Sequence, residues 1–310
     1  MENTKYSIGQ LLWYLWRDIP SYVYILIKLC SVNYWKRYRN LPAATKDVLL
    51  VLGNGPSIKD DMPQIIETSG DASIYCVNHF ADSEYFEILK PDFYGFLDPY
   101  FWESNVGEEY ERRRSESLRN LKEKTSWPLY VFIPDFAKIE VFNELANNEN
   151  IRLIVYNYLH RNLQNEWIFL RLLRKSILMP KAINVVHHSV FNGMMMGFNR
   201  IDVYGIDASI YRSLETDPIT NEVFNVHKHF YGINRTRIHF CGDTSRCLSM
   251  EECLGNETSI FKGYRVLASL SRLMRIETVN MCSNSMVDTM PRPIACSPLP
   301  ELANYESTTT

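Results

Sequence analysis

The sequence predicts an α/β fold: a Rossmann-like, doubly wound and mostly parallel sheet with helices on both faces. Three observations carry this prediction. From residue 46 to residue 290, short apolar runs alternate with longer segments of helical period, as in chains built from β–α–β units. The first run, Val48–Leu52, is apolar without a break, which is typical of a strand buried on both faces. It leads through two glycines to Pro56, a residue well suited to the start of a helix.

The individual elements follow from runs that are bounded by charge, glycine or proline. Strands are expected at residues 48–52, 73–77, 93–97, 129–133, 151–156, 201–207 and 276–280. Helices are expected from residue 56 onwards and at residues 80–89, 105–124, 162–178, 183–197 and 261–274. Residues 211–259 are polar and lack a clear period. A segment of that length within a domain is usually functional, so a polar lid is expected there.

Residues 1–45 form an aromatic-rich segment ahead of the expected sheet. Charges and Pro20 interrupt its apolar run, so two short helices are expected on either side of the proline. No run reaches the roughly 18–20 apolar residues that a membrane-spanning helix needs. Tryptophans, tyrosines and the basic residues at 36–39 suit the surface of a bilayer, so peripheral attachment to the inner face of the cell membrane is one expectation. Packing against the sheet domain, or against a second copy in a homo-oligomer, is the alternative.

The composition limits the class of protein and its compartment. The 310 residues, 46% of them hydrophobic, are enough for one large α/β domain, expected at residues 46–290. A net charge of −3 argues against a nucleic-acid-binding protein, which would be basic. The seven cysteines are scattered without a Cys-x-x-Cys pair, so neither a disulfide framework nor a zinc site is indicated, and a cytoplasmic protein is expected. The tail at residues 291–310 is rich in Pro, Ser and Thr and is expected to be disordered.

The turn after the first strand is expected to bind a nucleotide. Strand, glycine turn and helix start together point backbone N–H groups and the positive end of a helix at an anion. The third glycine of the dinucleotide-binding pattern is replaced by Ile58, and no Walker lysine follows. The second strand ends in Asn78, where an NAD-binding protein would place an acid. A nucleotide held by amides and asparagines is therefore preferred over NAD. The residues of the turn are Gly53, Asn54, Gly55, Pro56 and Ser57.

Polar residues also follow three other strands. Asn78, Asp98 and the pair Gly205 and Asp207 each stand at the carboxyl end of an expected strand. Because ligands of doubly wound sheets bind beyond the carboxyl ends of the strands, these residues are expected to share one site with the glycine turn.

Three stretches resemble the bacterial sialyltransferases of glycosyltransferase family 42. They are Val51-Leu-Gly-Asn-Gly-Pro-Ser-Ile-Lys59, Cys76-Val-Asn-His-Phe80 and Met196–Asp207, and the similarity covers about residues 47–80 and 183–290. The resemblance implies a GT-A-like variant of the Rossmann sheet and metal-independent transfer of a sialic acid or Kdo-type sugar from a CMP-activated donor, without a cofactor. The acceptor would be a glycan or lipid-linked glycan in bacterial surface polysaccharide assembly.

The resemblance also implies roles for individual residues. It puts Asn54, Gly55, Ser57 and Asn78 against the nucleotide, and Asn184 near the CMP-sugar. Tyr211 is similar in position to a tyrosine that contacts the phosphate in that family, and His229 corresponds to its catalytic histidine.

The chemistry of transfer makes its own demands. A base that titrates near neutrality must take the proton of the acceptor hydroxyl, and the candidates are His229, His227 and Asp207. The charge of the leaving phosphate could be met by the helix start at Pro56, by Tyr211 and Tyr231, or by Arg235 and Arg237.

Two other functions stay open. The same elements resemble the MptE-like hydroxymethylpterin diphosphokinases, which would need Mg²⁺, with Asp98 and Asp207 as the available ligands. The second histidine of the sialyltransferase lid pattern is Ile233 here, and its arginine is absent near Ala182. These departures favour the third function, a catalytically inactive nucleotide-sugar-binding assembly protein.

Overall fold

The computed structural model describes residues 7–30, 41–104, 106–181, 183–229, 232–240 and 243–293. Its centre is a seven-stranded sheet in the order β12-β6-β1-β2-β3-β4-β5, and every neighbouring pair is parallel. The strands are β1 Val48–Leu52, β2 Ala72–Val77, β3 Phe93–Gly95, β4 Leu129–Pro134, β5 Ile151–Tyr156, β6 Arg200–Tyr204 and β12 Glu277–Asn280. The fold class predicted from the sequence is confirmed.

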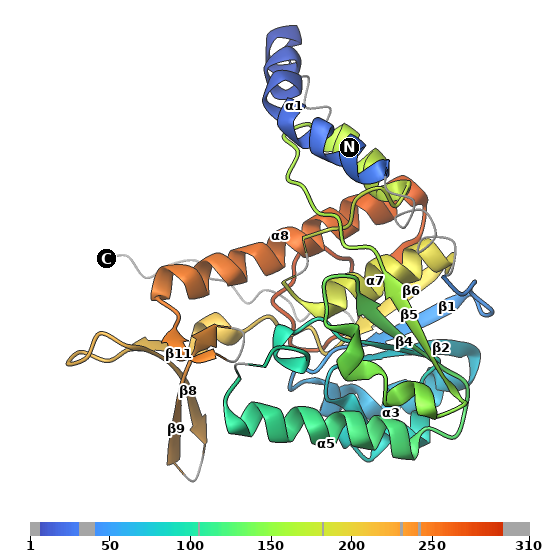
Figure 1. The fold of residues 1–310 in the computed structure, drawn as a ribbon, viewed down its shortest axis with the longest axis vertical. Helices are drawn as coiled ribbons and strands as arrows, with labels where there is room; N and C mark the ends of the chain where they lie inside the picture. Colours follow the sequence, from blue (N-terminus) through green and yellow to red (C-terminus); the bar gives the residue numbers. More distant parts are fainter. Residues whose placement is uncertain are drawn as a thin grey trace, which may run out of the picture.

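Helices cover both faces of this sheet (Figure 1). Side chains alternate along β1, so that Leu49 and Val51 join the core beneath α7 and α8, whereas Leu50 and Leu52 join the core with α3 and α5. Burial on both sides explains why the run is apolar without a break. The helices are α1 Ile8–Leu29, α3 Ile58–Thr68, α4 Tyr85–Leu89, α5 Glu108–Lys124, α6 Glu166–Arg174, α7 Val185–Met196 and α8 Met250–Met274.

The strand order reverses its direction at β1. The chain runs outward from β1 through β2, β3 and β4 to β5, and then returns to place β6 and β12 on the other side of β1. In doubly wound sheets the crevice outside the carboxyl ends at such a reversal is where ligands bind. The fold therefore points to the β1–β6 edge as the place to look for a site.

The segment expected to form a polar lid, from residue 211 onwards, contains regular secondary structure. It begins with a short 3-10 helix, η6 (Ile210–Ser213). The chain then forms an antiparallel sheet of β7 Leu214–Thr216, β8 Val223–His229 and β9 Gly232–Arg237. A second antiparallel pair follows, β10 His239–Phe240 with β11 Asp243–Cys247. Figure 1 shows β8 and β9 projecting from the body as an arm. The expected end of the lid at residue 259 is wrong, because residues 250–259 are the first turns of α8.

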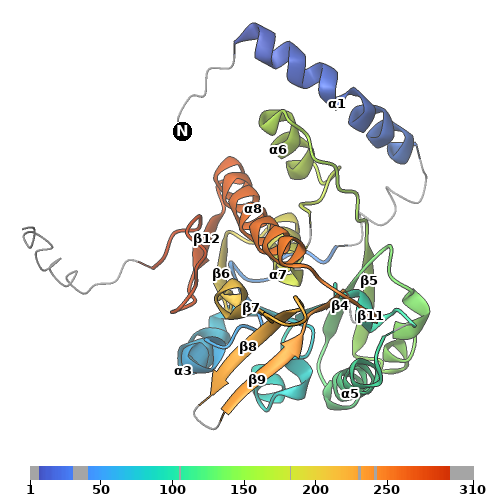
Figure 2. The same cartoon turned by 90° about the vertical axis from the view of Figure 1, so that its left-hand side faces the viewer.

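The N-terminal segment also differs from the prediction of two short helices. α1 is a single helix that continues through Pro20, although an internal proline costs roughly 3 kcal/mol. Tertiary contacts of residues before and after the proline hold the helix in place. Asp18, 2% exposed, accepts hydrogen bonds from the Gln164 and Asn165 N–H groups at 2.9–3.1 Å, and Ile25 is buried in the main core. Figure 2 shows α1 lying beside α6. Among the described residues, no helix is both long and apolar enough to span a bilayer.

Replacement of Asp18 by alanine tests this docking. The Gln164 and Asn165 N–H groups lose their acceptor, and at Asn165, which is buried, an unsatisfied donor costs about 1–3 kcal/mol. Hydrogen–deuterium exchange of these two amides should accelerate at least about fivefold, since ~1 kcal/mol of local opening corresponds to that factor. The exposed Asp71, replaced by alanine, is the matched control and should leave the exchange unchanged. Equal protection in the Asp18→Ala variant would show that α1 is not held to α6 by this carboxylate.

Candidate nucleotide site at the edge of the sheet

A cavity of about 280 Å³ lies at the carboxyl ends of β1 and β6, where the strand order reverses. Its size is close to the lower end of small-molecule sites, roughly 300–1,000 Å³. Its walls are the turn after β1, the end of β2, the loop after β6, the start of α7 and one face of α8. The residues predicted from the sequence that line it are Asn54, Gly55, Pro56, Asn78, Asn184, Gly205 and Asp207.

The two glycine turns at this edge are in direct contact. The Gly53 N–H donates to the carbonyl oxygen of Tyr204 and the Gly55 N–H to that of Gly205, both at 2.9 Å. A Cβ on Gly53 would lie 2.5 Å from the Gly205 carbonyl oxygen, and Gly205 itself has a φ of +63°. Glycine is therefore required by the close approach of two backbones and by a left-handed turn.

The start of α3 faces a carboxylate of the chain itself. The Ser57 N–H lies 3.3 Å from Asp207 Oδ1, and the Ser57 hydroxyl donates to Asp207 Oδ2 at 3.0 Å. Both residues are buried, and the positive end of the helix stabilises the carboxylate. The Ser57 N–H, which was expected to face a ligand phosphate, is thus already paired with Asp207. In this arrangement Ser57 and Asp207 hold the two turns together, and their roles toward a ligand stay predictions.

Asn78 is held through its side-chain nitrogen, and its side-chain carbonyl oxygen has no hydrogen-bond partner among the described residues. Its φ is +50°, and its Nδ2 donates to Asp98 Oδ2 at 2.8 Å. Because a carboxylate only accepts, this bond fixes which end of the amide points at Asp98. Asn78 Oδ1 is buried and has no partner among the described residues. Burial raises the pKa of Asp98, and the bond from Asn78 partly offsets it. Asp98 therefore orients the side-chain amide of Asn78.

The helix end that faces the cavity is that of α7. Asn184 caps it, with its Oδ1 accepting the Val186 N–H at 2.9 Å, and Asn184, Val185 and Val186 all line the cavity. α7 has 12 residues, so its peptide dipoles place partial positive charge at this end. An anion in the cavity would meet it there. Asn54, whose Nδ2 donates to the Val77 carbonyl at 3.2 Å, also lines the cavity.

Two residues of the site were missed from the sequence. Glu257 and Tyr264 lie on one face of α8, line the cavity and are buried, and neither Glu257 Oε2 nor the Tyr264 hydroxyl has a partner among the described residues. Burial raises the pKa of both groups. Glu257 fell within the expected lid. A signal existed, since Ser249 and Glu252 form a capping box that places the helix start at Met250.

The remaining predicted residues are spread around the site. Tyr211 is half-buried in η6, next to the cavity-lining Ile210. His227 and His229 belong to β8, and Tyr231 lies outside the described residues. None of these placements tests a catalytic role. The expectation of a lid histidine as base therefore stays a prediction.

The two histidines of α7 are part of the core. His187 and His188 are buried, and burial lowers their pKa values to about 4 and about 3. Both are neutral at pH 7. The His188 Nδ1 lies 2.6 Å from the Tyr156 hydroxyl, and the His187 ring packs edge-on against Tyr264 at 4.4 Å. His187 thus fixes the position of a ring that lines the cavity.

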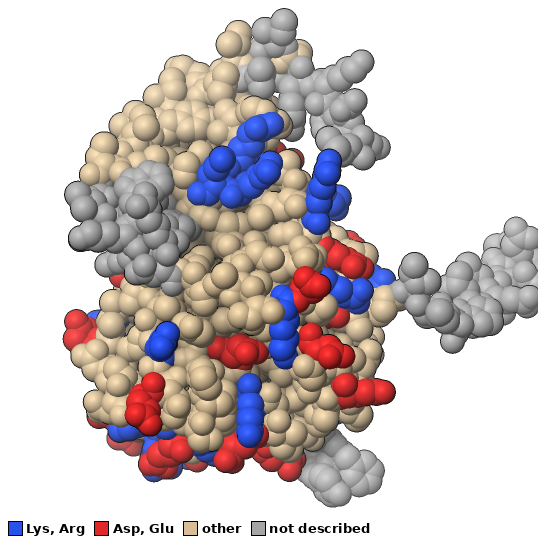
Figure 3. Space-filling view, turned by 90° about the vertical axis from the view of Figure 1, so that its right-hand side faces the viewer, with Lys and Arg blue, Asp and Glu red and all other residues tan. Residues whose placement is uncertain are grey.

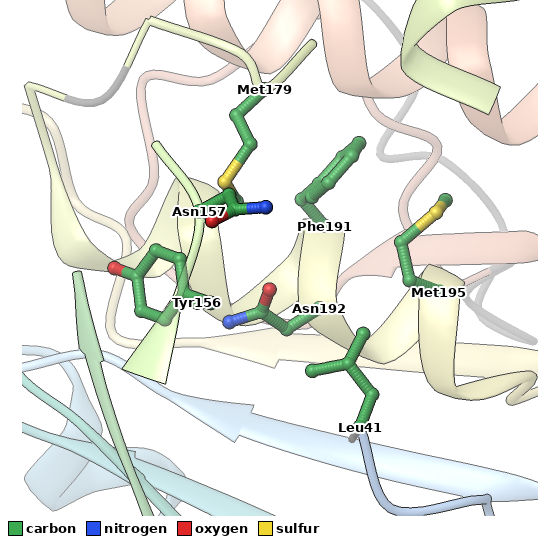
Figure 4. A pocket seen from close by; sticks show the side chains of 7 residues that line it. All are labelled: Leu41, Tyr156, Asn157, Met179, Phe191, Asn192 and Met195. Atoms are coloured by element: carbon green, nitrogen blue, oxygen red, sulfur yellow. The ribbon is translucent and has the colours of Figure 1, made fainter. Parts of the chain in front are cut away.

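Two further observations concern possible metal ligands and a second cavity. Within the part of the chain that the structure describes, no three His, Cys, Asp or Glu side chains come together as a metal site. Asp98 and Asp207, the magnesium ligands of the diphosphokinase hypothesis, are each bonded to a separate neighbour. Figure 4 shows a second cavity on the α7 side of the sheet, lined by Tyr156, Asn192 and Met195 among others. Its volume is about 10 Å³, enough for one water molecule.

The chain was compared with known proteins. No protein-family model and no curated protein sequence matches it. Among solved structures it is similar to the MAf glycosyltransferase from Magnetospirillum magneticum AMB-1, with a TM-score of 0.46 and 14% identity over 83% of this chain. The chain spans 37% of the length of that protein. It is also similar to the sialyltransferase CstII from Campylobacter jejuni, solved with the substrate analogue CMP-3FNeuAc, with a TM-score of 0.37 and 14% identity over 80% of this chain and 86% of that one. Similarities at this level assign no activity.

Proposed function

We propose that the protein is a glycosyltransferase whose nucleotide-sugar donor binds in the cavity between β1, β6, α7 and α8. One observation carries the proposal: three buried polar atoms without partners among the described residues belong to the walls of this one cavity. They are Asn78 Oδ1, Glu257 Oε2 and the Tyr264 hydroxyl. Native proteins leave few buried polar atoms unpaired, so such a group around a cavity indicates a polar ligand. A sugar nucleotide, with its hydroxyls, amine and phosphate, would satisfy them.

The donor we propose is a CMP-linked sialic acid or Kdo-type sugar. The resemblance of the glycine turn and its flanking stretches to family 42 sialyltransferases supports it. So does the start of α7 in the cavity wall, because its partial positive charge could meet the one phosphate of a CMP-sugar. The asparagines can both donate and accept, which suits a nucleotide base or ribose. Transfer would need no metal.

In the proposed reaction a hydroxyl of the acceptor attacks the anomeric carbon of the donor sugar. The bond from that carbon to the phosphate oxygen breaks, and CMP leaves with the bonding pair. The acceptor proton passes to a base of the protein. Besides His229 and His227, the structure offers Glu257, a buried carboxyl in the cavity wall. The start of α7 would stabilise the charge of the leaving phosphate.

The acceptor we propose is a glycan or lipid-linked glycan of bacterial surface polysaccharide assembly. Nucleotide sugars are made in the cytoplasm and lipid-linked acceptors lie in the membrane. The protein would therefore work in the cytoplasm, on the inner face of the cell membrane.

Thermal unfolding with a panel of nucleotides tests the proposal. CMP at about a hundred times its dissociation constant should stabilise the protein by ~2.7 kcal/mol, which shifts the melting temperature by several degrees. CDP, UDP, GDP and ATP at the same concentrations should shift it less. Stabilisation by ATP with Mg²⁺ and none by CMP would favour the diphosphokinase function. Binding of CMP without transfer from any CMP-sugar would favour the inactive assembly protein.

A further inference from the structure

α1 carries two apolar faces, and the protein body covers one of them. The covered face packs Ile25, 4% exposed, into the main core, and it also carries the buried carboxylate of Asp18, 2% exposed. On the other face, large apolar side chains follow one another at spacings of four and three residues. They are Leu12, Trp16, Ile19, Val23 and Leu26, with exposed fractions of 60%, 70%, 49%, 50% and 61%. A surface helix normally has one apolar stripe, turned inward. A second continuous stripe turned outward marks an interaction site.

α6 carries a further exposed apolar side chain at the same end of the molecule as α1 (Figure 2). Trp167, near its start, is 64% exposed. α6 is held beside α1 by the hydrogen bonds that Asp18 accepts from the Gln164 and Asn165 N–H groups, and by Arg161, whose guanidinium lies 3.6 Å from the centre of the Tyr24 ring. Figure 2 shows the two helices side by side at one end of the molecule. We call the five exposed apolar residues of α1, together with Trp167, the outer face.

The outer face is flanked by cations. Arg17 stacks over Trp13 at 5.0 Å and Arg171 over Trp167 at 4.0 Å, and Lys28 stands in the last turn of α1. Asp18 is the only acidic residue of α1, and it is buried. In Figure 3, acidic side chains gather over the lower half of the molecule. The upper part, at the height of α1 and α6 in Figure 1, is mostly uncharged, and the charged side chains seen there are mainly Lys and Arg. An occupant with negative charge and an apolar interior would complement this surface.

We propose that the outer face binds the surface of an anionic phospholipid bilayer, with α1 lying in the plane of the interface. Its apolar stripe would enter the boundary between headgroups and acyl chains, its tryptophans would sit at headgroup level, and its arginines and lysine would meet the phosphates. A second copy of the chain is the less favoured occupant. Face-to-face pairing of two α1 helices would bring their positively charged side chains close together, and these repel each other.

Flotation of the full-length protein with lipid vesicles tests this proposal. The protein should float with vesicles of phosphatidylcholine and phosphatidylglycerol at 7:3, float less with pure phosphatidylcholine, and be released as the salt concentration rises. The double variant Trp16→Glu, Val23→Glu places charge in the apolar stripe and should bind these vesicles at least tenfold more weakly. The matched control, Ile88→Glu with Ile219→Glu, changes two residues that are 58% and 90% exposed elsewhere on the molecule and should bind like the parent.

Nucleotide stabilisation of both variants separates this inference from the proposed function. It should equal that of the parent, which shows that both are folded and that membrane binding does not depend on the donor site. Equal vesicle binding by the outer-face variant and the parent would overturn the proposal, as would absence of binding to anionic vesicles. A parent dimer in sedimentation equilibrium that the outer-face substitutions dissociate, without vesicle binding by the parent, would assign the face to a second copy instead.

Discussion

Replacement of Gly55 by alanine is expected to weaken donor binding in the cavity about 10- to 100-fold. The new methyl group would lie 1.9 Å from Asp207 Oδ2 and 2.6 Å from the carbonyl oxygen of Gly205. The carboxylate is held by Ser57, and the carbonyl accepts the N–H of Gly55 itself, so neither can move without breaking a bond that joins the two turns. Overpacking of this kind costs about 1–3 kcal/mol. The turn must shift to relieve the overlap, and a loss of comparable size in its contacts with the donor would lower CMP affinity about 10- to 100-fold, since every ~1.4 kcal/mol is a factor of ten.

Calorimetric titration with CMP measures this effect, and Gly70 provides the matched control. A Cβ at Gly70 would meet no atom within 4 Å, so Gly70→Ala should bind CMP like the parent. Parental affinity in the Gly55→Ala variant would show that the nucleotide binds away from the β1–β6 turns.

Replacement of Glu257 by glutamine is expected to slow transfer about 10²- to 10⁴-fold, the usual contribution of a general base. Glutamine keeps the size of the side chain and cannot take a proton, so the affinity for CMP should change little. Burial raises the pKa of Glu257. A base works only when ionised, so the rate of the parent should fall as the pH drops through this raised pKa. The variant should lose that part of the pH dependence. A pH–rate profile of both proteins with a CMP-sugar and an acceptor measures the effect.

Glu251→Gln is the control for this experiment, because Glu251 lies exposed on the same helix. It should leave the rate and its pH dependence unchanged. If His229→Ala removes transfer and Glu257→Gln does not, the base is the lid histidine expected from the sequence. If Glu257→Gln weakens CMP binding and transfer in the same proportion, Glu257 holds the donor and moves no proton.

Most of the sheet could be predicted because its strands are buried on both faces. In such strands every side chain must be apolar, and the resulting runs are visible without any knowledge of their neighbours. β1 and β5 were placed at their observed bounds, and the other strands of the central sheet within two or three residues. The α8 start was missed because residues 250–259 were read as part of a polar segment, although its capping box was present in the sequence.

The residues that line the cavity were predicted in part for a similar reason. Parallel strands end at the same edge, so residues that follow β1, β2 and β6 must come close together, and Asn54, Gly55, Asn78 and Gly205 do. Local pattern cannot show which of these groups stay unpaired. Ser57 was expected to face a ligand, yet it binds Asp207, which is 150 residues away in the chain.

The sequence by itself therefore determined the fold class, the run of β–α units and the edge of the sheet where the cavity lies, because apolar period and glycine turns are local properties of the chain. The tertiary structure alone decided which polar groups are paired. It placed β6 beside β1, brought Asp207 to the start of α3, and turned Glu257 and Tyr264 into the cavity. It also carried α1 through Pro20, since the contacts of Asp18 and Ile25 with the body outweigh the local cost of the proline. Pairing and burial depend on residues far apart in the chain, and only folding brings those together.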